Sequence, residues 1–405
     1  MQVYTGIDWS ENKHDVLFMN EEGAVVTYLV IPHSPDGFQE FDDARKKLGV
    51  TPAECLVGLE TAHNIIIDFL WSRNYTQVYV IPPNVTKSCQ GRYRQSGAYT
   101  DKSAALLIAD LLRTDRHRLQ PWHPDLPVTQ QMRAKISFIL YLTHIAVRLS
   151  NRLRAVLLRY YPAAVNLFSA LDGVVTLEFI RAYPTPQAAA ALSRDKFETF
   201  ARQHGYIQTK HLPACFARLQ APQPQAAPAV IESYRAEAVS LATLLLNTVR
   251  TKKTTYKELG KLFVQHPDHE IFASLPGVGA LLAPALLVKL GDDRDRFPSP
   301  ASVQALAGTC PVTKQSGKYK YVQFRKACDR DFRYISQQWA LHSLDVSVWA
   351  NTYIQRVYSR GHSKSHALRC LANRWLAVAW KLWQTRQLYD EDYHLRQQAK
   401  RRKPK

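Results

Sequence analysis

The stretch 2–31, "QVYTGIDWSENKHDVLFMNEEGAVVTYLVI", decides the fold that we expect for the first part of this chain. It contains three runs rich in apolar and β-branched residues, at 2–8, 13–20 and 24–31, and the short "EEG" turn separates the last two. Because short connections join antiparallel neighbours, we predict three antiparallel strands from this stretch.

Helices and strands alternate after these three strands. We expect a helix over 35–49, a strand over 55–60, a helix from about Ala62, a strand over 77–82 and a helix opened by Thr100 and Asp101. Three antiparallel strands followed by alternating helices and strands is the element order of the ribonuclease H superfamily, and other α/β folds remain compatible with it. We assign this α/β domain to residues 1–125.

The pattern changes to long helices from about residue 126. Two runs, Met132–Leu157 and Ile231–Phe263, repeat apolar residues at alternating three- and four-residue spacing, like an imperfect heptad. The Pro-, Gln- and Ala-rich segment 220–229 precedes the second run. Two such helices can pair as an antiparallel coiled-coil arm, assemble between subunits, or belong to an ordinary bundle. We assign residues 126–265 to this helical linker and 266–405 to a mainly α C-terminal domain.

A glycine-rich turn opens the C-terminal domain. The sequence "LPGVG" at 275–279 contains Gly277 and Gly279, and an apolar helix follows it directly. Free N–H groups at a helix N-terminus bind phosphate, so this helix-hairpin-helix-like motif is a candidate contact to a nucleic-acid backbone. A simple tight turn is the alternative interpretation.

A basic and aromatic segment lies further along the same domain. Between Thr313 and Arg333 there are seven Lys or Arg residues against two Asp, interleaved with Tyr319, Tyr321 and Phe324. Positive charge beside aromatic faces suits a nucleic-acid strand. The side chains that we predict to contact nucleic acid here are Lys314, Lys318, Lys320, Arg325 and Lys326. The tryptophans of the last helices, at helical spacing, are expected in the core.

Composition narrows the class of protein. Lys and Arg outnumber Asp and Glu by 53 to 34 among 405 residues, and the net charge of +19 argues for a polyanionic partner, most simply nucleic acid. The six cysteines form no Cys-x-x-Cys pair, so neither disulfides nor zinc are expected. With no signal-peptide pattern and no apolar run near the ~20 residues that cross a bilayer, we expect a soluble cytoplasmic protein without a membrane partner.

Acidic residues stand at the ends of two apolar strands. Asp8 closes the first strand, Glu60 closes "CLVGLE", and Asp101 begins a later helix. An acid that ends an apolar strand must be solvated, paired or metal-bound, and strand ends are where ligands meet an α/β sheet. Three carboxylates from three elements suit Mg²⁺ or Mn²⁺, whereas each acid taken singly is an ordinary capping or solvated residue.

The sequence resembles the transposases of the insertion sequence 110 family, the bridge-RNA-guided recombinases. The similar motifs are "GIDWSENKHDV", "GLET", "VYVIPPN" and "YTDKSAALLIADLLR" in the first part and "LPGVG", "LLVKLGD" and "ALAGTCPVTKQSG" in the third. The resemblance implies a RuvC-like domain with Asp-Glu-Asp-Asp acids and a C-terminal transposase domain with a nucleophilic serine. By these motifs the acids fall on Asp8, Glu60 and Asp101, and the serine falls on Ser316.

The fourth acid of this pattern is missing, because Ala104 occupies its position. At 100° per residue Asp110 lies on the opposite side of the helix from Asp101, and Asp115 lies ~21 Å along it, so neither can replace the acid. Asp15 on the neighbouring strand is a further acid that the sequence does not place. Either the chain has a natural three-acid site, or a substitution has inactivated it; the matching neighbours of Ala104 favour the second.

The resemblance implies an activity and its partners. Ser316 would attack a DNA phosphodiester to give a phosphoserine-linked strand, Mg²⁺ would assist, and a structured guide (bridge) RNA would pair with double-stranded donor and target DNA. No His or acid neighbours Ser316 in the sequence, so its base would come from the Asp8, Glu60 and Asp101 site, in one composite centre. We expect a homodimer or homotetramer in the bacterial cytosol or nucleoid.

Two alternatives remain open at this stage. The first is a metal-dependent nuclease of the Holliday-junction type that uses water and no serine. The second is a nucleic-acid-binding protein without catalysis, for which Ala104 is the best support. By residue type alone, "QSGK" is a plain turn.

Overall fold

The structure, a computed structural model, describes residues 2–61, 65–92 and 100–402. The chain forms two compact units, residues 1–124 and 125–405. The predicted division of the second unit at residues 265 and 266 stays a prediction.

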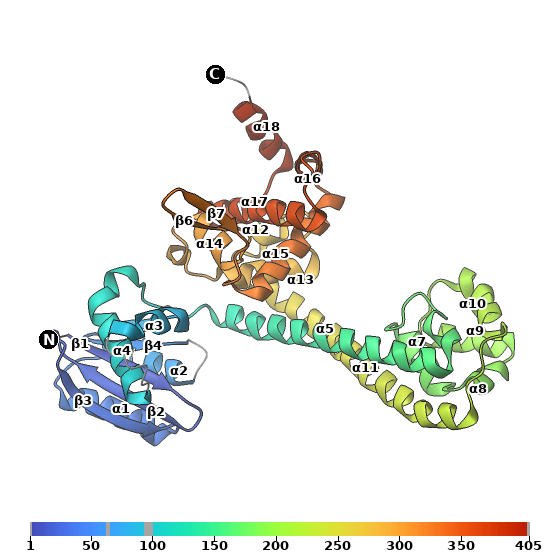
Figure 1. The fold of residues 1–405 in the computed structure, drawn as a ribbon, viewed down its shortest axis with the longest axis horizontal. Helices are drawn as coiled ribbons and strands as arrows, with labels where there is room; N and C mark the ends of the chain where they lie inside the picture. The colour runs from blue at the N-terminus through green and yellow to red at the C-terminus, as the bar shows by residue number, and fades with distance from the viewer. Residues whose placement is uncertain (1, 62–64, 93–99, 403–405) are drawn as a thin grey trace. The chain divides into compact units, whose positions relative to one another are not determined.

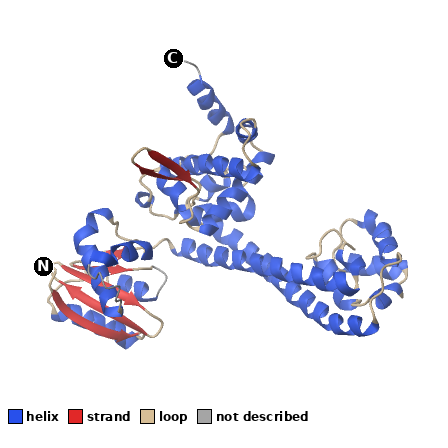
Figure 2. Ribbon diagram, in the orientation of Figure 1, coloured by secondary structure: helices blue, strands red, loops and turns tan. Residues whose placement is uncertain are grey.

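The first unit contains a five-stranded sheet in the order β3-β2-β1-β4-β5 (Figures 1 and 2). Its strands are β1 (Val3–Trp9), β2 (Lys13–Met19), β3 (Val25–Pro32), β4 (Cys55–Leu59) and β5 (Val78–Val80). The first three strands pair antiparallel, which confirms the prediction. Strand β4 pairs parallel with β1, and β5 pairs parallel with β4. The mixed α/β class predicted for this part of the chain is therefore confirmed.

Helices cover both faces of this sheet. Its helices are α1 (Pro35–Lys47), α2 (Ile65–Ser72), α3 (Pro83–Cys89) and α4 (Asp101–Asp115), with 3₁₀ turns at Gln90–Arg92 and Arg116–Arg118. Phe41 of α1 and Ile66 of α2 pack in a core on one face of the sheet, and Ile108 of α4 packs on the other. The predicted helix start near Ala62 lies outside the described residues. Thr100 caps α4 as predicted: its hydroxyl accepts from the backbone N–H of Ser103.

A glycine brings α4 close to the centre of the sheet. A Cβ atom built on Gly6 of β1 would lie 2.0 Å from the carbonyl oxygen of Ala105 in α4. No side chain fits in that space, so only glycine permits this contact. The alternation of side chains along β1 therefore turns Tyr4, Gly6 and Asp8 toward α4.

Two long helices organise the second unit. They are α5 (Pro127–Tyr160) and α11 (Pro228–Phe263), and they pack along each other (Figure 1). Ion pairs join Lys135 to Glu258 at 2.5 Å and Arg152 to Glu237 at 2.7 Å, so the two helices run antiparallel. Of the arrangements that the heptad-like pattern allowed, the antiparallel arm within one chain is the one observed.

A separate hydrophobic core forms at each end of this arm. The core at one end includes α6 (Pro162–Val165), α7 (Val174–Ala182), α8 (Pro186–Ala190), α9 (Arg194–Gln203) and α10 (Leu212–Gln220), and an exposed 3₁₀ turn, Thr209–His211, precedes α10. The other includes α12 (His269–Ala273), α13 (Gly279–Leu290), α14 (Pro300–Leu306), α15 (Arg330–His342), α16 (Val348–Tyr358), α17 (Lys364–Thr385) and α18 (Glu391–Arg402), with 3₁₀ turns at Arg294–Arg296 and Ser343–Asp345.

The C-terminal core contains buried tryptophans among mainly aliphatic residues. Trp339, Trp375 and Trp383 are completely buried in it, which agrees with the expectation that the tryptophans of these helices are structural. A two-stranded ribbon, β6 (Val312–Ser316) and β7 (Tyr319–Gln323), extends from this helical body (Figure 2). None of the described helices has the length and apolar character needed to span a bilayer.

Candidate functional site

Two of the predicted acids end neighbouring parallel strands at the same level. Ile7 of β1 pairs with Leu59 of β4, so the residues that follow them, Asp8 and Glu60, lie side by side at the carboxyl edge of the sheet. Asp8 faces α4 by the alternation along β1. The N-terminus of α4, which carries Asp101, reaches this same edge, because α4 packs across β1, β2 and β4.

The electrostatics of Asp8 show that these acids influence one another. Its pKa is raised to about 6, first by burial and then by repulsion from Glu60, Asp101 and Asp15. Like charges favour the neutral form of a carboxyl only when they lie close to it. The structure therefore brings the three predicted acids together and adds a fourth carboxylate, that of Asp15.

Asp15 is held beside Asp8 by its strand. The two residues face each other across β1 and β2, and their side chains point to the same side of the sheet. The Asp15 side chain is only 5 % exposed and accepts a hydrogen bond from the hydroxyl of Tyr28 on β3. The sequence showed this acid without locating it; the strand register places it.

A lysine lies among the carboxylates. The ammonium of Lys13 lies 3.2 Å from Asp101 Oδ2 and 3.5 Å from Asp15 Oδ2. These contacts, the Asp101 hydrogen bond above all, raise the pKa of Lys13, and its positive charge lowers that of Asp8. Lys13 was not among the predicted site residues, although its two-residue spacing from Asp15 along a strand was a signal for a shared face.

Glu60 is positioned by a residue that the sequence analysis also missed. The hydroxyl of Thr86 in α3 donates a hydrogen bond of 2.5 Å to Glu60 Oε1 and is itself almost fully buried. This contact holds the Glu60 carboxylate at the sheet edge. No spacing pattern in the sequence linked Thr86 to Glu60, because the contact depends on how α3 folds back after β5.

Ala104 is buried on the side of α4 that faces the sheet, with 2 % of its surface exposed. The two acids considered as replacements are engaged elsewhere. Asp110 pairs with Arg113 at 2.6 Å, and Asp115 pairs with Arg118 at 3.3 Å. The position of the expected fourth acid therefore carries a methyl group, and the acid that approaches the site comes from β2.

The carboxylates at the sheet edge are the type of ligand that a hard divalent cation prefers, but their side chains are not yet arranged around one point. Carboxylate oxygens are the ligands that Mg²⁺ and Mn²⁺ prefer, and mutual repulsion of the acids would be relieved by a cation. Among the described residues, however, no three His, Cys, Asp or Glu side chains already stand close enough to hold a metal ion. Asp101 is 61 % exposed and bound to Lys13, so it would have to turn from the lysine toward Asp8 and Glu60.

The predicted nucleophile lies on the ribbon of the second unit. Ser316 ends β6, and Gly317, with φ of +54°, begins the two-residue turn to β7. A hairpin of this length needs a positive φ at its first turn residue, which glycine supplies. Ser316 is exposed, and within the described residues its hydroxyl makes no hydrogen bond to a protein group. The structure therefore presents this hydroxyl to solvent without a local base.

The predicted basic residues surround this serine and extend to the base of the ribbon. Lys314, Lys318, Lys320 and Lys326 are exposed, and Arg325 is half-buried. The guanidinium groups of Arg333 and Arg369 lie 4.4 and 4.7 Å from the centre of the Phe324 ring. No described carboxylate pairs with these two arginines, so their charge stays available to an anion. The sequence did not reveal Arg369, which arrives from α17.

The two glycines of the "LPGVG" turn have different roles. A Cβ atom on Gly277 would lie 2.5 Å from the carbonyl oxygen of His342, so this glycine allows close packing on α15. A Cβ on Gly279 would meet nothing within 4 Å, and Gly279 is exposed at the start of α13. Both line an open depression of about 510 Å³. Only Gly279 leaves the helix N-terminus accessible to a phosphate.

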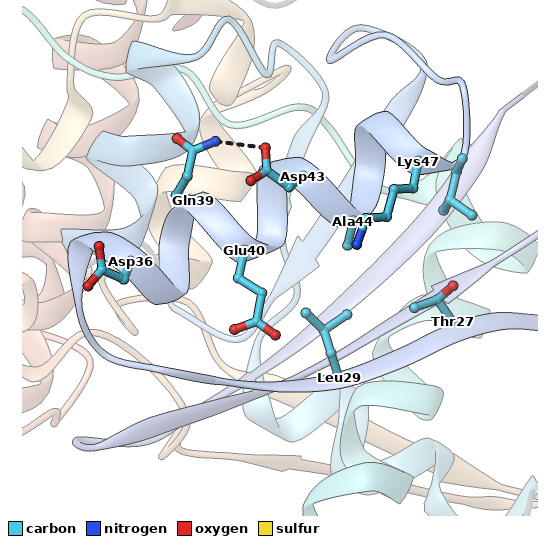
Figure 3. Close-up of a pocket in the computed structure, with 9 residues that line it drawn as sticks. Thr27, Leu29, Asp36, Gln39, Glu40, Asp43, Ala44 and Lys47 are labelled. Atoms are coloured by element: carbon cyan, nitrogen blue, oxygen red, sulfur yellow. Dashed lines mark hydrogen bonds between the residues drawn. The ribbon is translucent and has the colours of Figure 1, made fainter.

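A second depression, in the first unit, lies away from these acids. It has a volume of about 460 Å³ between β3 and α1 and is lined by Asp36, Glu40 and Asp43, among others (Figure 3). Asp43 accepts from Gln39 at 2.8 Å and from Lys46 at 3.0 Å. None of the predicted site residues lines this groove, so the candidate site is the sheet edge.

Comparison with known proteins extends these observations. A family model described as "Transposase", the DEDD-type transposase domain of IS110 elements, matches residues 5–162, and the model "Transposase IS116/IS110/IS902 family" matches residues 269–355. The chain belongs to the IS110 family of transposases. The first match of this transposase includes Asp8, Glu60 and Asp101, and the second includes Gly277, Gly279 and Ser316.

Two relatives of the transposase match it over nearly its full length. A Streptomyces coelicolor protein, named as the proposed transposase of the IS117 mini-circle, is 29 % identical over 96 % of both chains. An uncharacterised 44.8 kDa protein of the insertion element IS116 from Streptomyces clavuligerus is 26 % identical, also over 96 % of both chains. An IS900 protein of Mycobacterium paratuberculosis is 26 % identical over 76 % of this chain and 77 % of its own. The chain is thus an insertion-element transposase, which implies a DNA-processing enzyme.

Proposed function

We propose that this transposase cuts and rejoins DNA strands of its insertion element through a phosphoserine intermediate on Ser316. The proposal adds that Asp8, Glu60 and Asp101 hold Mg²⁺ or Mn²⁺ and that a structured guide RNA selects donor and target DNA. The observation that carries it is the convergence of these acids from three elements. Burial, and then repulsion from Glu60 and Asp101, raises the pKa of Asp8 to about 6. Perturbed carboxyl groups of this kind are typical of catalytic sites.

The topology supports a RuvC-like, ribonuclease H-type identity for the first unit. Three antiparallel strands lead into two parallel strands, and a helix that carries an acid packs across them. The acids at the ends of β1 and β4 and at the start of α4 then belong to one edge. This arrangement fits the motif positions on which the resemblance to the family rests.

The chemistry that we propose balances in two transfers. The Ser316 oxygen forms a bond to phosphorus while the bond to the DNA 3′ oxygen breaks. The serine proton passes to a base, and the leaving 3′ oxygen takes up a proton to become a free 3′-hydroxyl. A 3′-hydroxyl on the exchanged strand then gives up its proton and attacks the phosphorus, while the bond to the serine oxygen breaks and that oxygen regains a proton. A bound divalent ion would stabilise charge on the transferring phosphate.

The ribbon alone does not supply a base that could accept the proton of Ser316. Its neighbours are lysines, glycine and tyrosine, none of which is a good proton acceptor at neutral pH. We propose that the carboxylates of the first unit accept this proton during the reaction, within one centre or between two subunits. Without a bound cation, burial and then repulsion from its neighbours raise the pKa of Asp8 to about 6, so that its carboxylate is largely ionised at pH 7.

A guide RNA and a multimer complete the proposal. The net charge of +19 suits backbone contacts to two kinds of nucleic acid, and base pairing would then supply sequence specificity. Strand exchange joins two DNA duplexes, so a homodimer or homotetramer is expected. Sequencing of the nucleic acid that co-purifies with the chain tests the first point: a discrete RNA supports it, and random fragments contradict it.

A covalent-trapping experiment tests the nucleophile. An end-labelled DNA strand carrying the element's terminus should stay attached to the protein in denaturant, and Ser316→Ala should abolish the attachment. Thr313→Ala is the matched control, because Thr313 is an exposed hydroxyl of the same strand. Cleavage that persists in Ser316→Ala would indicate a metal-dependent nuclease that uses water.

One observation favours a second function, nucleic-acid binding with little or no cleavage. Ala104 takes the place of an acid, and Lys13 is bound to Asp101. Ala104→Asp should raise recombination with Mg²⁺ at least ten-fold if a ligand has been lost, and Asp8→Ala or Glu60→Ala in that background should remove it again while RNA binding persists. No gain from Ala104→Asp would favour the binding protein.

A further inference from the structure

The strand register of the β6–β7 ribbon separates its side chains into two faces. Ser316 pairs with Tyr319, and Lys314 pairs with Tyr321. Paired residues point to the same side, and residues two apart along a strand share a face. One face, which we call the tyrosine face, therefore carries Lys314, Ser316, Tyr319 and Tyr321. The opposite face carries Thr313, Gln315, Lys320 and Val322.

The two tyrosines are unusually open to solvent. Tyr319 is 85 % exposed and Tyr321 is 62 % exposed. Neither ring stacks on another ring or carries a cation above it, as far as the described residues extend. Large aromatic surfaces left uncovered beside a polar rim mark binding sites more often than scattered apolar residues do. These rings lie next to the hydroxyl proposed as nucleophile.

Their spacing fits a flat ligand. Residues two apart on a strand are separated by about 6.6 Å, which is close to twice the ~3.4 Å between stacked bases in one DNA strand. One planar base inserted between the Tyr319 and Tyr321 rings would therefore contact both. Stacking of a base on an aromatic side chain stabilises the complex and tolerates any base.

The positive charge at this face indicates that the ligand carries phosphates as well as a base. Lys314 shares the face, and Lys318 lies in the turn beside Ser316. Their ammonium groups can offset the phosphates on either side of a stacked base. Bases within a duplex are already stacked on both sides, so the ligand is an unpaired nucleotide. Strand exchange requires such nucleotides at the cut.

We propose that the tyrosine face binds an unpaired DNA nucleotide and thereby holds the neighbouring phosphate at Ser316. This inference rests on the proposed function, because it takes Ser316 as the nucleophile. Tyr319 and Tyr321 act as positioning residues, which bind the strand without exchanging protons or electrons with it. Single-stranded DNA is the chosen ligand, rather than the guide RNA, because the face contains the hydroxyl that attacks DNA.

Fluorescence of 2-aminopurine in a short single-stranded DNA tests the proposal with the full chain. Stacking quenches this base, so the parent chain should quench it several-fold on binding. Tyr319→Ala with Tyr321→Ala should remove the quenching and weaken binding about ten-fold, whereas Tyr→Phe at both positions should retain both effects. Quenching that persists without the two rings would overturn the inference.

Controls come from the other face and from the serine. Val322→Ala and Gln315→Ala alter exposed side chains of the opposite face and should leave the quenching unchanged; an equal loss there would contradict a face-specific site. Ser316→Ala should lose the covalent product and keep the quenching, so failure of the nucleophile and failure of the stacking site are distinguishable. Tighter binding of an RNA of the same sequence would also overturn the assignment to DNA.

Discussion

At the scale of single residues, the sheet edge is a balance of charges rather than a finished metal site. Glu60, Asp101 and Asp15 repel the Asp8 carboxylate there, and the ammonium of Lys13 offsets this repulsion. An ammonium and a divalent ion compete for the same carboxylate oxygens. We therefore expect Lys13 to influence how readily these acids accept the metal that we propose.

Lys13→Met tests this competition. Removal of the ammonium leaves the acids with a more negative field, so the affinity for Mn²⁺ should rise roughly three- to ten-fold at neutral pH. Isothermal titration of the full chain with Mn²⁺ measures it, and Lys47→Met, on α1, is the control. A lower affinity in Lys13→Met would mean that the lysine holds Asp101 in its binding position.

His14 makes the folding stability of the first unit depend on pH. It is fully buried, with its Nε2 atom 2.9 Å from His33 Nδ1, and its pKa is lowered to about 4 by burial and by repulsion from His33. The unfolded chain binds a proton near pH 6.5, whereas the folded chain binds it only near pH 4. The contribution of neutral His14 to the unfolding free energy is therefore fully present above pH 6.5 and is lost as the pH falls toward 4.

His14→Phe should remove this dependence. Between pH 7 and 4, protonation of this group should lower the unfolding free energy of the parent chain by up to about 3 kcal/mol. The variant lacks the group, so its unfolding free energy should not show this part of the decrease. Phenylalanine suits the site because His14 stacks near Phe38. Urea unfolding at several pH values measures the difference. Parallel pH profiles for both proteins would show that His14 is not the group responsible.

At the scale of elements, the contact between α4 and β1 determines where Asp101 lies. Gly6 allows it, since any Cβ would meet the carbonyl oxygen of Ala105 at 2.0 Å. Gly6→Ala should cost about 1–3 kcal/mol or more and weaken Mn²⁺ binding, because α4 must move away from the sheet. Gly91→Ala, with nothing within 4 Å, should stay within about 0.5 kcal/mol of the parent. Urea unfolding and metal titration of both variants check this.

The base of the ribbon is a second element-scale feature, formed by Arg333 and Arg369 over Phe324. Arginines beside an aromatic ring that form no ion pair within the described residues are well suited to a phosphate. Arg369→Met should weaken DNA binding uniformly across sequences and reduce the slope of log affinity against log salt by about one. Arg235→Met, on the arm and paired with Glu232, is the control. An unchanged salt slope would assign Arg369 to packing.

At the scale of the whole molecule, the residues that we propose to act together belong to two units. The acids belong to residues 1–124, and the serine, the ribbon and the glycine turn belong to residues 125–405. The proposed reaction requires both, so loss of either should abolish strand joining while the other retains its own ligand. The long antiparallel helices α5 and α11 join separate cores within the second unit.

Much of this organisation was predictable from local patterns. Short turns and alternating apolar residues predicted the antiparallel strands, and Thr100 predicted the start of α4, because these signals act over a few residues. The heptad-like runs predicted long helices without fixing their partners. The ion pairs between Lys135 and Glu258 and between Arg152 and Glu237, which settle the antiparallel arm, join residues far apart in the chain.

The sequence by itself determined the α/β class of the first unit, the acids at its strand ends, the positive charge and the family to which the chain belongs. Only the tertiary structure decided that Asp15 and Lys13 join Asp8, that Thr86 holds Glu60, and that Ser316 shares a face with two exposed tyrosines. Strand register and helix packing decide such contacts, and both arise from burial of apolar surface by the chain as a whole.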